Sequence, residues 1–181
     1  MTSMQGLSGA GRSPGVIALD TIDNVIPYIN GEEEKVEKEG HKIFGRLQDG
    51  KIEPANFLVS ATCTRVPVLE GHTESLVVVP EKPCSITDVK SAMIGFGKDF
   101  IDLKLPSCPR HIILLKDDPY RPQPRLDRNA EGGMATTVGR LRGDPTFKNG
   151  LKYVLVSHNT KMGAAKGAVL TAEYLCKFGY V

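Results

Sequence analysis

The ten residues from Arg65 to Glu74, RVPVLEGHTE, place strong limits on how this chain can fold. A turn containing proline and glycine separates Arg65 from His72. The flanking runs 57–64 and 73–79 are rich in Val, Thr and small residues, which favours strands. The pattern predicts two strands joined by a loop, with Arg65 and His72 close together at its mouth. An arginine can hold a carboxylate through two parallel donors, and a histidine can move a proton near neutral pH.

Each of these two residues also has an ordinary structural interpretation. An arginine that ends a strand often just reaches solvent, and a histidine beside a turn is as a rule a surface or hydrogen-bonded structural residue. Glu74, two residues beyond His72, would lie on the same strand face and is placed to hold the imidazole and tune its pKa. The spacing alone leaves the structural and the functional interpretations open.

The composition is that of one globular domain: 181 residues, 40% hydrophobic and 24% charged. The 23 basic and 21 acidic residues are intermixed, so no basic stripe suggests nucleic acid, and a small anionic substrate is easier to accommodate. The N-terminus lacks the pattern of a targeting peptide, and no apolar run approaches membrane-spanning length. We therefore expect a soluble, cytoplasmic protein.

The four cysteines suggest neither a disulfide framework nor a zinc site. They show no CxxC pairing and no histidine-rich neighbourhood, and most lie in or beside apolar runs. We expect reduced, buried thiols at Cys63, Cys84, Cys108 and Cys176, and no bound metal.

Hydrophobic periodicity predicts an α+β fold with a largely antiparallel or mixed sheet covered by helices, because several strand neighbours are joined by short turns. Residues 1–15 are rich in Gly and Ser, which is typical of a loop or frayed terminus. Helical spacing covers 19–29, 32–47, 85–96 and 161–178, whereas 55–65, 73–79, 111–115, 134–142 and 151–157 read as strands and 117–128 as a loop.

The predicted helix at 32–47 leaves the roles of Glu32 and Lys35 open. Val36, Ile43 and Leu47 form a narrow apolar stripe, and Glu32 and Lys35 lie on or beside it. These charges either find partners in a polar cavity or belong to a solvated helix start, with Glu32 near the positive end of the helix dipole. The remaining charges of the first turns, Glu33, Glu34, Glu37 and Lys38, should face away from the stripe.

Three further patterns have more than one interpretation. The run Ser8–Gly11, SGAG, either belongs to the loop or brings bare backbone close to a ligand. Arg140 and Arg142, on one side of a strand, suit a phosphate, a subunit contact or a protected sheet edge equally. Gly163 and Gly167 make one side of the last helix smooth, which implies that something packs there.

Taken together, five motifs resemble aspartate-semialdehyde dehydrogenase of the fungal and archaeal type. Their order and spacing cover essentially the whole chain, so the set is far more specific than any single member. The motifs are SGAG at 8–11, GEEEK at 31–35, RVPVLEGHTE at 65–74, VGRLRGDP at 138–145 and HNTKMGAAKGAVL at 158–170.

The resemblance implies a fold like the C-terminal domain of glyceraldehyde-3-phosphate dehydrogenase-like enzymes. It also implies NADP-dependent reductive dephosphorylation of aspartyl phosphate to aspartate semialdehyde, which feeds lysine, methionine, threonine and isoleucine synthesis. By position, Arg65 would clamp the substrate carboxylate, His72 would be the acid/base, Glu32 would hold the amino group and Lys35 would bind phosphate. Ser8, Gly9 and Asn159 would contact the cofactor.

The sequence departs from the family's pattern in two ways. The family's glycine-rich dinucleotide-binding turn and its Asn-Cys nucleophile motif are not found in these 181 residues. We therefore expect residues 1–15 to be a remnant of the segment after the nucleophile, 16–158 the substrate-binding and dimerisation domain, and 159–181 a helix that returns to the cofactor domain.

Two hypotheses about function follow. The first is a substrate-binding domain that forms a homodimer, with a tetramer as the alternative, and has no turnover and no NADP binding on its own. The second is a non-catalytic dimerisation or interaction module. In either case we expect an exposed surface at the Gly163/Gly167 face and at the N-terminal segment.

Overall fold

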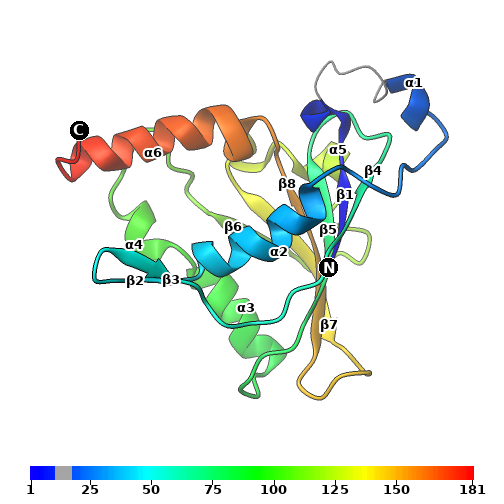
Figure 1. Ribbon diagram of the computed structural model, residues 1–181, viewed down its shortest axis with the longest axis horizontal. Helices are drawn as coiled ribbons and strands as arrows, with labels where there is room; N and C mark the ends of the chain where they lie inside the picture. Colours follow the sequence, from blue (N-terminus) through cyan, green and yellow to red (C-terminus); the bar gives the residue numbers. More distant parts are fainter. Residues whose placement is uncertain (11–17) are drawn as a thin grey trace.

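The computed structural model describes residues 1–10 and 18–181 (Figure 1). Gly11 of the SGAG run and the rest of the predicted N-terminal loop, residues 11–15, lie outside the described residues.

One mixed, six-stranded sheet organises the chain, and its strand order is β4-β1-β5-β8-β7-β6. The pairs β1/β4 and β6/β7 are parallel and the other three are antiparallel, which confirms the predicted α+β class with a mixed sheet. The strands are β1 Thr2–Gln5, β4 Thr62–Arg65, β5 His72–Val78, β6 Ile113–Lys116, β7 Thr136–Gly143 and β8 Leu151–Ser157.

The prediction of a loop at the N-terminus was wrong for residues 2–5. Strand β1 inserts between β4 and β5, so the two strands that flank the Arg65–Glu74 segment do not pair with each other. The buried residues of β1 are Ser3 and Gln5, whereas Thr2 is exposed and Met4 half-buried. Because the buried side chains of β1 are polar, its sequence lacks the alternation of apolar and polar residues by which a strand is recognised.

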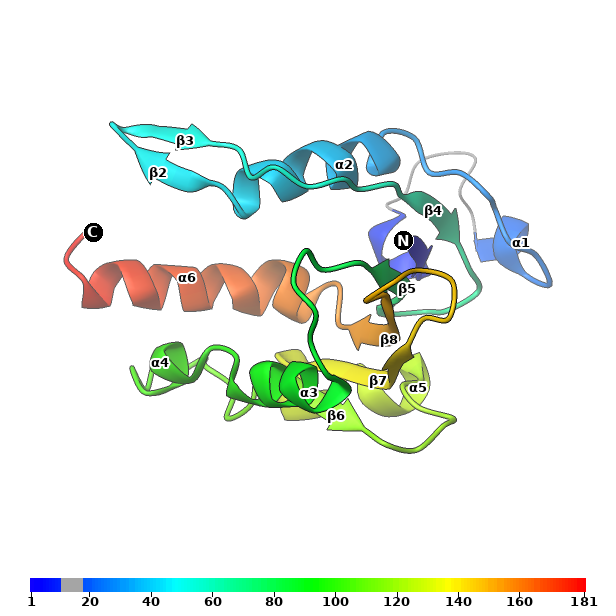
Figure 2. The ribbon, with the colours of Figure 1, turned by 90° about the horizontal axis from the view of Figure 1, so that it is seen from below.

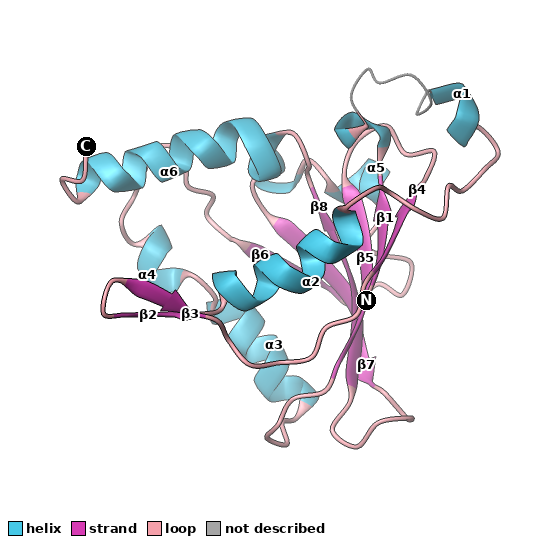
Figure 3. Ribbon diagram, viewed as in Figure 1, coloured by secondary structure: helices cyan, strands magenta, loops and turns pink. Residues whose placement is uncertain are grey.

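Helices α2, α3 and α6 lie on the same side of this sheet in Figure 2, and the β2–β3 hairpin projects away from it. The N-terminus lies within the sheet, and the C-terminus lies at the far end of α6 (Figure 3). The helices are α1 Ala18–Thr21, α2 Glu32–Ile43, α3 Ile86–Gly95, α4 Lys98–Ile101, α5 Pro124–Asp127 and α6 Lys166–Lys177, with 3-10 turns at Leu7–Gly9 and Ala130–Gly133 and a π-helical turn at Lys161–Ala165; the hairpin strands are β2 Arg46–Gln48 and β3 Lys51–Glu53.

The sequence located α3, β8 and the last helix well. Ser85 caps α3 with a full capping box to Asp88, and β8 has the predicted bounds. The expected helix at 19–29 is only α1, because Ile26 instead forms an antiparallel bridge with Arg65. The expected strand at 55–65 begins only at Thr62, and the expected loop at 117–128 contains α5.

The predicted orientation of α2 was wrong for Glu33 and Glu37, whereas Glu34 and Lys38 are exposed as predicted. Glu33 Oε1 accepts a hydrogen bond from Cys63 N at 2.9 Å, and Glu37 Oε1 accepts one from Ala61 N at 3.2 Å. These N–H groups belong to the free edge of β4 and the residues just before it, and an unpaired edge needs acceptors rather than methyl groups. The expected apolar positions Ile43 and Leu47 are therefore exposed, and Leu47 lies in β2.

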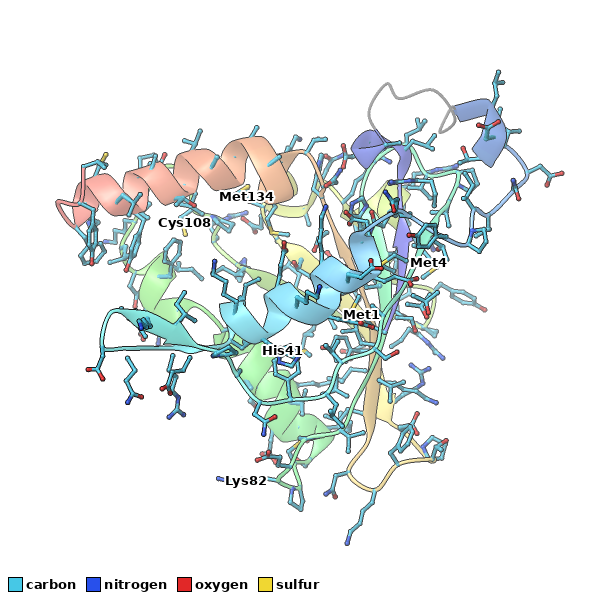
Figure 4. All side chains as sticks on the ribbon, in the orientation of Figure 1. Met1, Met4, His41, Lys82, Cys108 and Met134 are labelled. Atoms are coloured by element: carbon cyan, nitrogen blue, oxygen red, sulfur yellow. The ribbon has the colours of Figure 1, made fainter. Side chains whose placement is uncertain are left out.

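The buried core is small and centred on the sheet. It comprises Ala61, Cys63, Leu105, Met134, Ala135, Val138, Leu151 and Val156. All four cysteines are free, as expected, but Cys84 and Cys176 are exposed, so the prediction that they are buried was wrong. Cys108 is half-buried and lies near α6 (Figure 4), where Ser107 donates two hydrogen bonds to Glu173 of that helix.

Large apolar side chains are also exposed outside this core. The hairpin region alone exposes Phe44, Leu47 and Ile52. Gly163 is exposed, as expected, but Gly167 is half-buried and a Cβ atom added to it would meet Met162 O, so the prediction of an exposed Gly163/Gly167 face was wrong for Gly167. Within residues 1–10 and 18–181, no helix has the length and apolarity needed to cross a membrane.

Candidate active site

Arg65, Gln5 and His72 form one row across three adjacent strands. Gln5 of β1 is the register partner of Arg65 on its parallel side and of His72 on its antiparallel side. Residues directly opposite each other in a sheet project from the same face, so the three side chains share one face. The expected proximity of Arg65 and His72 is thus present, with a strand between them rather than a loop at their mouth.

The backbone of Gly6 joins Arg65 to His72. Arg65 Nη1 donates to Gly6 O at 2.7 Å, and Gly6 N–H is shared between Gly71 O and His72 Nδ1, both at 3.2 Å. Because Nδ1 accepts, the neutral ring of His72 carries its hydrogen on Nε2. Burial lowers the pKa of His72, and the positive charge of Arg65 lowers it further, so the neutral ring dominates near neutral pH.

Arg65 is a buried cation with few partners. Its side chain belongs to a residue that is 5% exposed, and its Nε lies buried without a hydrogen bond among the described residues. Burial lowers the pKa of its guanidinium, while the charge of Glu32 opposes that effect. A guanidinium in this position gains strongly from an added carboxylate, because the cost of removing it from water has already been met.

Glu32, at the start of α2, turns toward this row. Gln5 Nε2 donates to Glu32 Oε2 at 3.3 Å, and Lys35 Nζ lies 2.9 Å from Glu32 Oε1. The hydrogen bond from Lys35 is the main reason why the pKa of Glu32 is lowered. The side chain of Lys35 is 59% exposed. Glu32 therefore turns inward and finds partners, whereas Lys35 stays in contact with solvent.

Ser8, Gly9 and Asn159 lie beside Arg65 and His72. Asn159 Nδ2 donates to Ser8 Oγ at 3.1 Å. A Cβ atom placed on Gly9 would lie 3.2 Å from Asn159 Nδ2, 3.5 Å from Arg65 Nη1 and 3.8 Å from His72 Cε1. Gly9 therefore brings bare, exposed backbone up to these side chains, and the approach of this backbone to a ligand stays a prediction.

Glu70 is a residue of this region that the sequence interpretation missed. It accepts hydrogen bonds from Ser8 Oγ at 3.1 Å, from Gly71 N at 2.8 Å and from Asn159 N at 2.9 Å. Gln5 was missed as well. Neither residue has a sequence signal, because a glutamine in a short polar strand and a glutamate in a turn are both common on solvated surfaces.

Glu74 does not take the role that its position suggested. The described structure contains no hydrogen bond between Glu74 and His72, and the carboxylates whose charges act on His72 are Glu70 and Glu32. Burial raises the pKa of Glu74, whose register partners are Ser3 and Leu155.

Arg140 and Arg142 lie far along the sheet from this site. They line a hollow of about 190 Å³ near the edge strand β6, together with Lys90 and Lys116. A β-bulge between Gly139 and Arg142 breaks the expected alternation, and Arg140 adopts a φ of 59°. Neither arginine belongs to the row of Arg65 and His72.

The chemistry available is that of an anion-binding site with a proton carrier. A buried guanidinium, a half-buried imidazole and a carboxylate–ammonium pair suit a small zwitterionic acid. Among residues 1–10 and 18–181, no three His, Cys, Asp or Glu side chains are grouped so as to hold a metal ion.

Comparisons with known proteins show which family the chain belongs to. The family described as "Semialdehyde dehydrogenase, dimerisation domain" matches residues 1–162. The aspartate-semialdehyde dehydrogenase of Methanothermobacter thermautotrophicus is 47% identical over 175 residues, which are 97% of this chain and 50% of that protein. The protein of the same name from Saccharomyces cerevisiae is 44% identical over 181 residues, covering 96% of this chain and 49% of that protein.

Solved structures show the same relationship. Aspartate semialdehyde dehydrogenase with NADP from Candida albicans superposes with a TM-score of 0.86 at 38% identity, covering 99% of this chain and 50% of that chain. Aspartate semialdehyde dehydrogenase II complexed with ASA from Vibrio cholerae gives 0.75 at 26% identity, covering 97% and 53%. This chain therefore spans about half the length of the relatives it matches. It belongs to the semialdehyde dehydrogenase family and corresponds to the dimerisation domain of the aspartate-semialdehyde dehydrogenases.

Proposed function

We propose that this chain provides the substrate-binding part of an aspartate-semialdehyde dehydrogenase site, for the NADP-dependent conversion of aspartyl 4-phosphate to aspartate semialdehyde. The observation that carries the proposal is the row of Arg65, Gln5 and His72, to which Gln5 also joins Glu32. Three kinds of group that an aspartate derivative needs, a cation, a proton carrier and a carboxylate, thereby meet on one sheet face.

Arg65 holds the α-carboxylate of the substrate in this proposal. No carboxylate of the described residues forms a salt bridge with it, and one of its donors is already fixed by Gly6 O. The substrate carboxylate would compensate the buried charge and engage donors that now lack a partner.

Glu32 and Lys35 bind the charged ends of the substrate. Glu32, kept ionised by Lys35 and Gln5, accepts from the substrate ammonium group. Lys35 is exposed, so its ammonium group can turn from Glu32 toward the phosphate of aspartyl phosphate or toward free phosphate.

His72 moves the proton of the reaction. Its neutral ring offers Nε2–H toward the substrate, and the long, shared bond from Gly6 leaves Nδ1 able to take a second hydrogen when the ring acts as an acid. Ser8, Gly9 and Asn159 would line one side of an NADP site without binding the cofactor on their own, and NADP supplies hydride transfer when bound. The exposed backbone of Gly9 fits this role, since no side chain there keeps a flat ring away.

We further propose that the 181-residue chain does not turn over alone. The cysteine closest in sequence to the site, Cys63, is fully buried, and burial together with Glu33 raises the pKa of its thiol. A nucleophile needs the opposite, an accessible thiolate. A mixture of the chain with aspartate semialdehyde, phosphate and NADP should therefore produce no NADPH absorbance.

Ligand binding tests the main proposal. Calorimetry should detect aspartate semialdehyde binding to the 181-residue chain, and Arg65→Lys should weaken it at least about tenfold, because a lysine cannot form the two-donor contact. Arg46→Lys, an exposed arginine on β2, is the matched control and should bind as the parent does. Equal binding by Arg65→Lys and the parent chain would reject the proposed clamp.

Self-association is a second candidate function of the isolated chain. The exposed apolar side chains and the family's description as a dimerisation domain support it. We propose a homodimer, with a tetramer as the next possible assembly. Sedimentation velocity across micromolar concentrations should show a dimer, and a monomer throughout would contradict this function.

A further inference from the structure

We infer that Glu70 is a positioning residue, which uses its ionised carboxylate to hold two separate chain segments against the site of Arg65 and His72. This inference rests on the proposed function. The two segments are Ser8–Gly9, which follows β1, and Asn159–Thr160, which follows β8. They are 150 residues apart in sequence and carry the residues proposed to contact the cofactor.

The hydrogen bonds of Glu70 connect both segments to the turn before β5. Oε1 accepts from Ser8 Oγ at 3.1 Å, from Asn159 N at 2.9 Å and from Thr160 N at 3.3 Å. Oε1 also accepts from Gly71 N at 2.8 Å, and Oε2 accepts from Thr160 Oγ1 at 2.7 Å. Since Gly71 directly precedes His72, the same carboxylate reaches the segments and the backbone next to the imidazole.

Only an ionised carboxylate satisfies this set of donors. All five contacts come from N–H or O–H groups, and a carboxylate accepts at both oxygens, whereas an amide offers one oxygen and two hydrogens. Burial would raise the pKa of Glu70, but the hydrogen bonds from Thr160, Gly71 and Ser8 outweigh it and leave the pKa lowered.

His158 is a neighbour of this carboxylate but not its ion-pair partner near neutral pH. Its Nδ1 lies 3.3 Å from Glu70 Oε1, yet the same nitrogen accepts from Lys161 N at 3.2 Å. Burial lowers the pKa of His158, so the ring is neutral and Nδ1 carries no hydrogen. The charge of Glu70 is therefore held by its hydrogen bonds, which makes them the basis of the positioning.

The geometry next to His72 shows what the hydrogen bonds of Glu70 control. The Ser8–Gly9 segment lies against Asn159 and the guanidinium of Arg65, and a Cβ placed on Gly9 would lie only 3.8 Å from His72 Cε1. A shift of this segment by about 1 Å would move one wall of the site, and displacements of that size cost roughly a hundredfold in catalysis. Glu70 also raises the pKa of His72 through its charge, against the larger effect of burial.

Glu70→Gln in the 181-residue chain tests the inference without any ligand. Hydrogen exchange followed by NMR should show the amides of Gly71, Asn159 and Thr160 exchanging at least about tenfold faster than in the parent chain, as expected for loss of charge-assisted bonds. The buried Val156 amide should keep its parent rate, and the imidazole of His72 should titrate at lower pH. Glu74→Gln, a carboxylate on β5 without bonds to either segment, is the matched control and should leave all three amides unchanged.

A second variant keeps the test decisive if Glu70→Gln does not fold. Glu70→Asp retains the charge but is shorter by one methylene, so it should accelerate exchange at Asn159 and Thr160 while Gly71, the nearest donor in sequence, stays protected. Parent-like exchange at Asn159 and Thr160 in whichever of the two variants folds would overturn the inference. Acceleration spread evenly over the whole sheet would also overturn it, because a general loss of stability is not positioning. Since neither readout involves the substrate, failure of aspartate semialdehyde to bind would count against the proposed function alone.

Discussion

Arg65 and His72 are both register partners of Gln5, one across a parallel pair and the other across an antiparallel pair. Their separation is therefore set by the spacing of strands on either side of β1, and not by the turn that joins them in sequence. A distance fixed by two rows of backbone hydrogen bonds is more rigid than one fixed by a loop, as a site for a small substrate requires.

The central position of Gln5 predicts a specific effect of its removal. Gln5→Ala deletes the hydrogen bond to Glu32, so the pKa of Glu32 should rise and the affinity for aspartate semialdehyde should fall. Loss of one hydrogen bond to a charged group is worth about 1.5 kcal/mol, or roughly tenfold in affinity.

Calorimetry and NMR titration of the Glu32 carboxyl measure these two effects of Gln5→Ala. Gln48→Ala, on the exposed strand β2, serves as the control and should change neither. Unchanged affinity in Gln5→Ala would show that Glu32 acts independently of β1.

The fold was predictable wherever apolar side chains determine an element. Strand β8, LKYVLVS, was located from its apolar run and helix α3 from its helical spacing, because in both segments the local pattern matches the element that forms. Strand β1 was not, since its buried side chains Ser3 and Gln5 are polar. Its place in the sheet depends on pairing with residues about 60 positions away, which no local pattern reports.

Part of the site was predictable because some residue types indicate their chemistry directly. The types of residue in RVPVLEGHTE indicate chemistry, so Arg65 and His72 stood out, and the roles of Glu32 and Lys35 came from the family resemblance. The inward face predicted for α2 was wrong because Glu33 and Glu37, which face inward, accept hydrogen bonds from free N–H groups at the sheet edge. Glu70 could not be identified from sequence because four of its five donors come from chain segments that meet it only in the folded protein.

Thiol reagents should distinguish the cysteines sharply. Cys84 and Cys176 are exposed and should react quickly in the folded protein. Cys63 should react only as fast as the chain unfolds, because it is fully buried and burial with nearby carboxylates raises the pKa of its thiol. Mass spectrometry of timed labelling, with urea-unfolded protein as the control, measures this. Rapid modification of Cys63 in the folded chain would contradict its assignment as an inert thiol.

Stability should decrease as the pH falls from about 7 to 5. The pKa values of His72 and His158 are lowered in the folded state, with burial as the first cause. Above the unfolded value of about 6.5 both states are neutral, so these groups have no effect on stability. Below it the unfolded chain binds protons more readily, and the free energy of unfolding falls until the pH passes the folded values.

Urea denaturation at a series of pH values measures this decrease. His158→Gln should make the curve shallower between about pH 7 and 5, because one of the two imidazoles with a lowered pKa no longer titrates. Protonation of Glu32 and Glu70, whose pKa values are lowered, also reduces the free energy of unfolding, but only in a separate range below about pH 4.3. A stability independent of pH from 7 to 5 in the parent chain would contradict the buried, neutral state of both histidines.

Gly6 should be intolerant of any side chain because of close packing, not because of its backbone angles. Its φ of −72° is ordinary, but an added Cβ would lie 2.7 Å from both Gly71 O and Val68 O, which are backbone atoms that cannot rotate away. Gly6→Ala should therefore lower the free energy of unfolding by about 1–3 kcal/mol, as overpacking does. It should also weaken aspartate semialdehyde binding, since Gly6 bonds to both Arg65 and His72.

Gly95→Ala provides the matched comparison. Gly95 is the last residue of α3, and a Cβ added there meets nothing within 4 Å. This variant should gain up to about 0.5–1 kcal/mol from reduced backbone entropy in the unfolded chain. Urea denaturation and calorimetry of both variants measure the difference. Equal stability of Gly6→Ala and the parent chain would mean that the turn before β5 moves freely, and a turn that moves freely could not hold His72 beside Arg65.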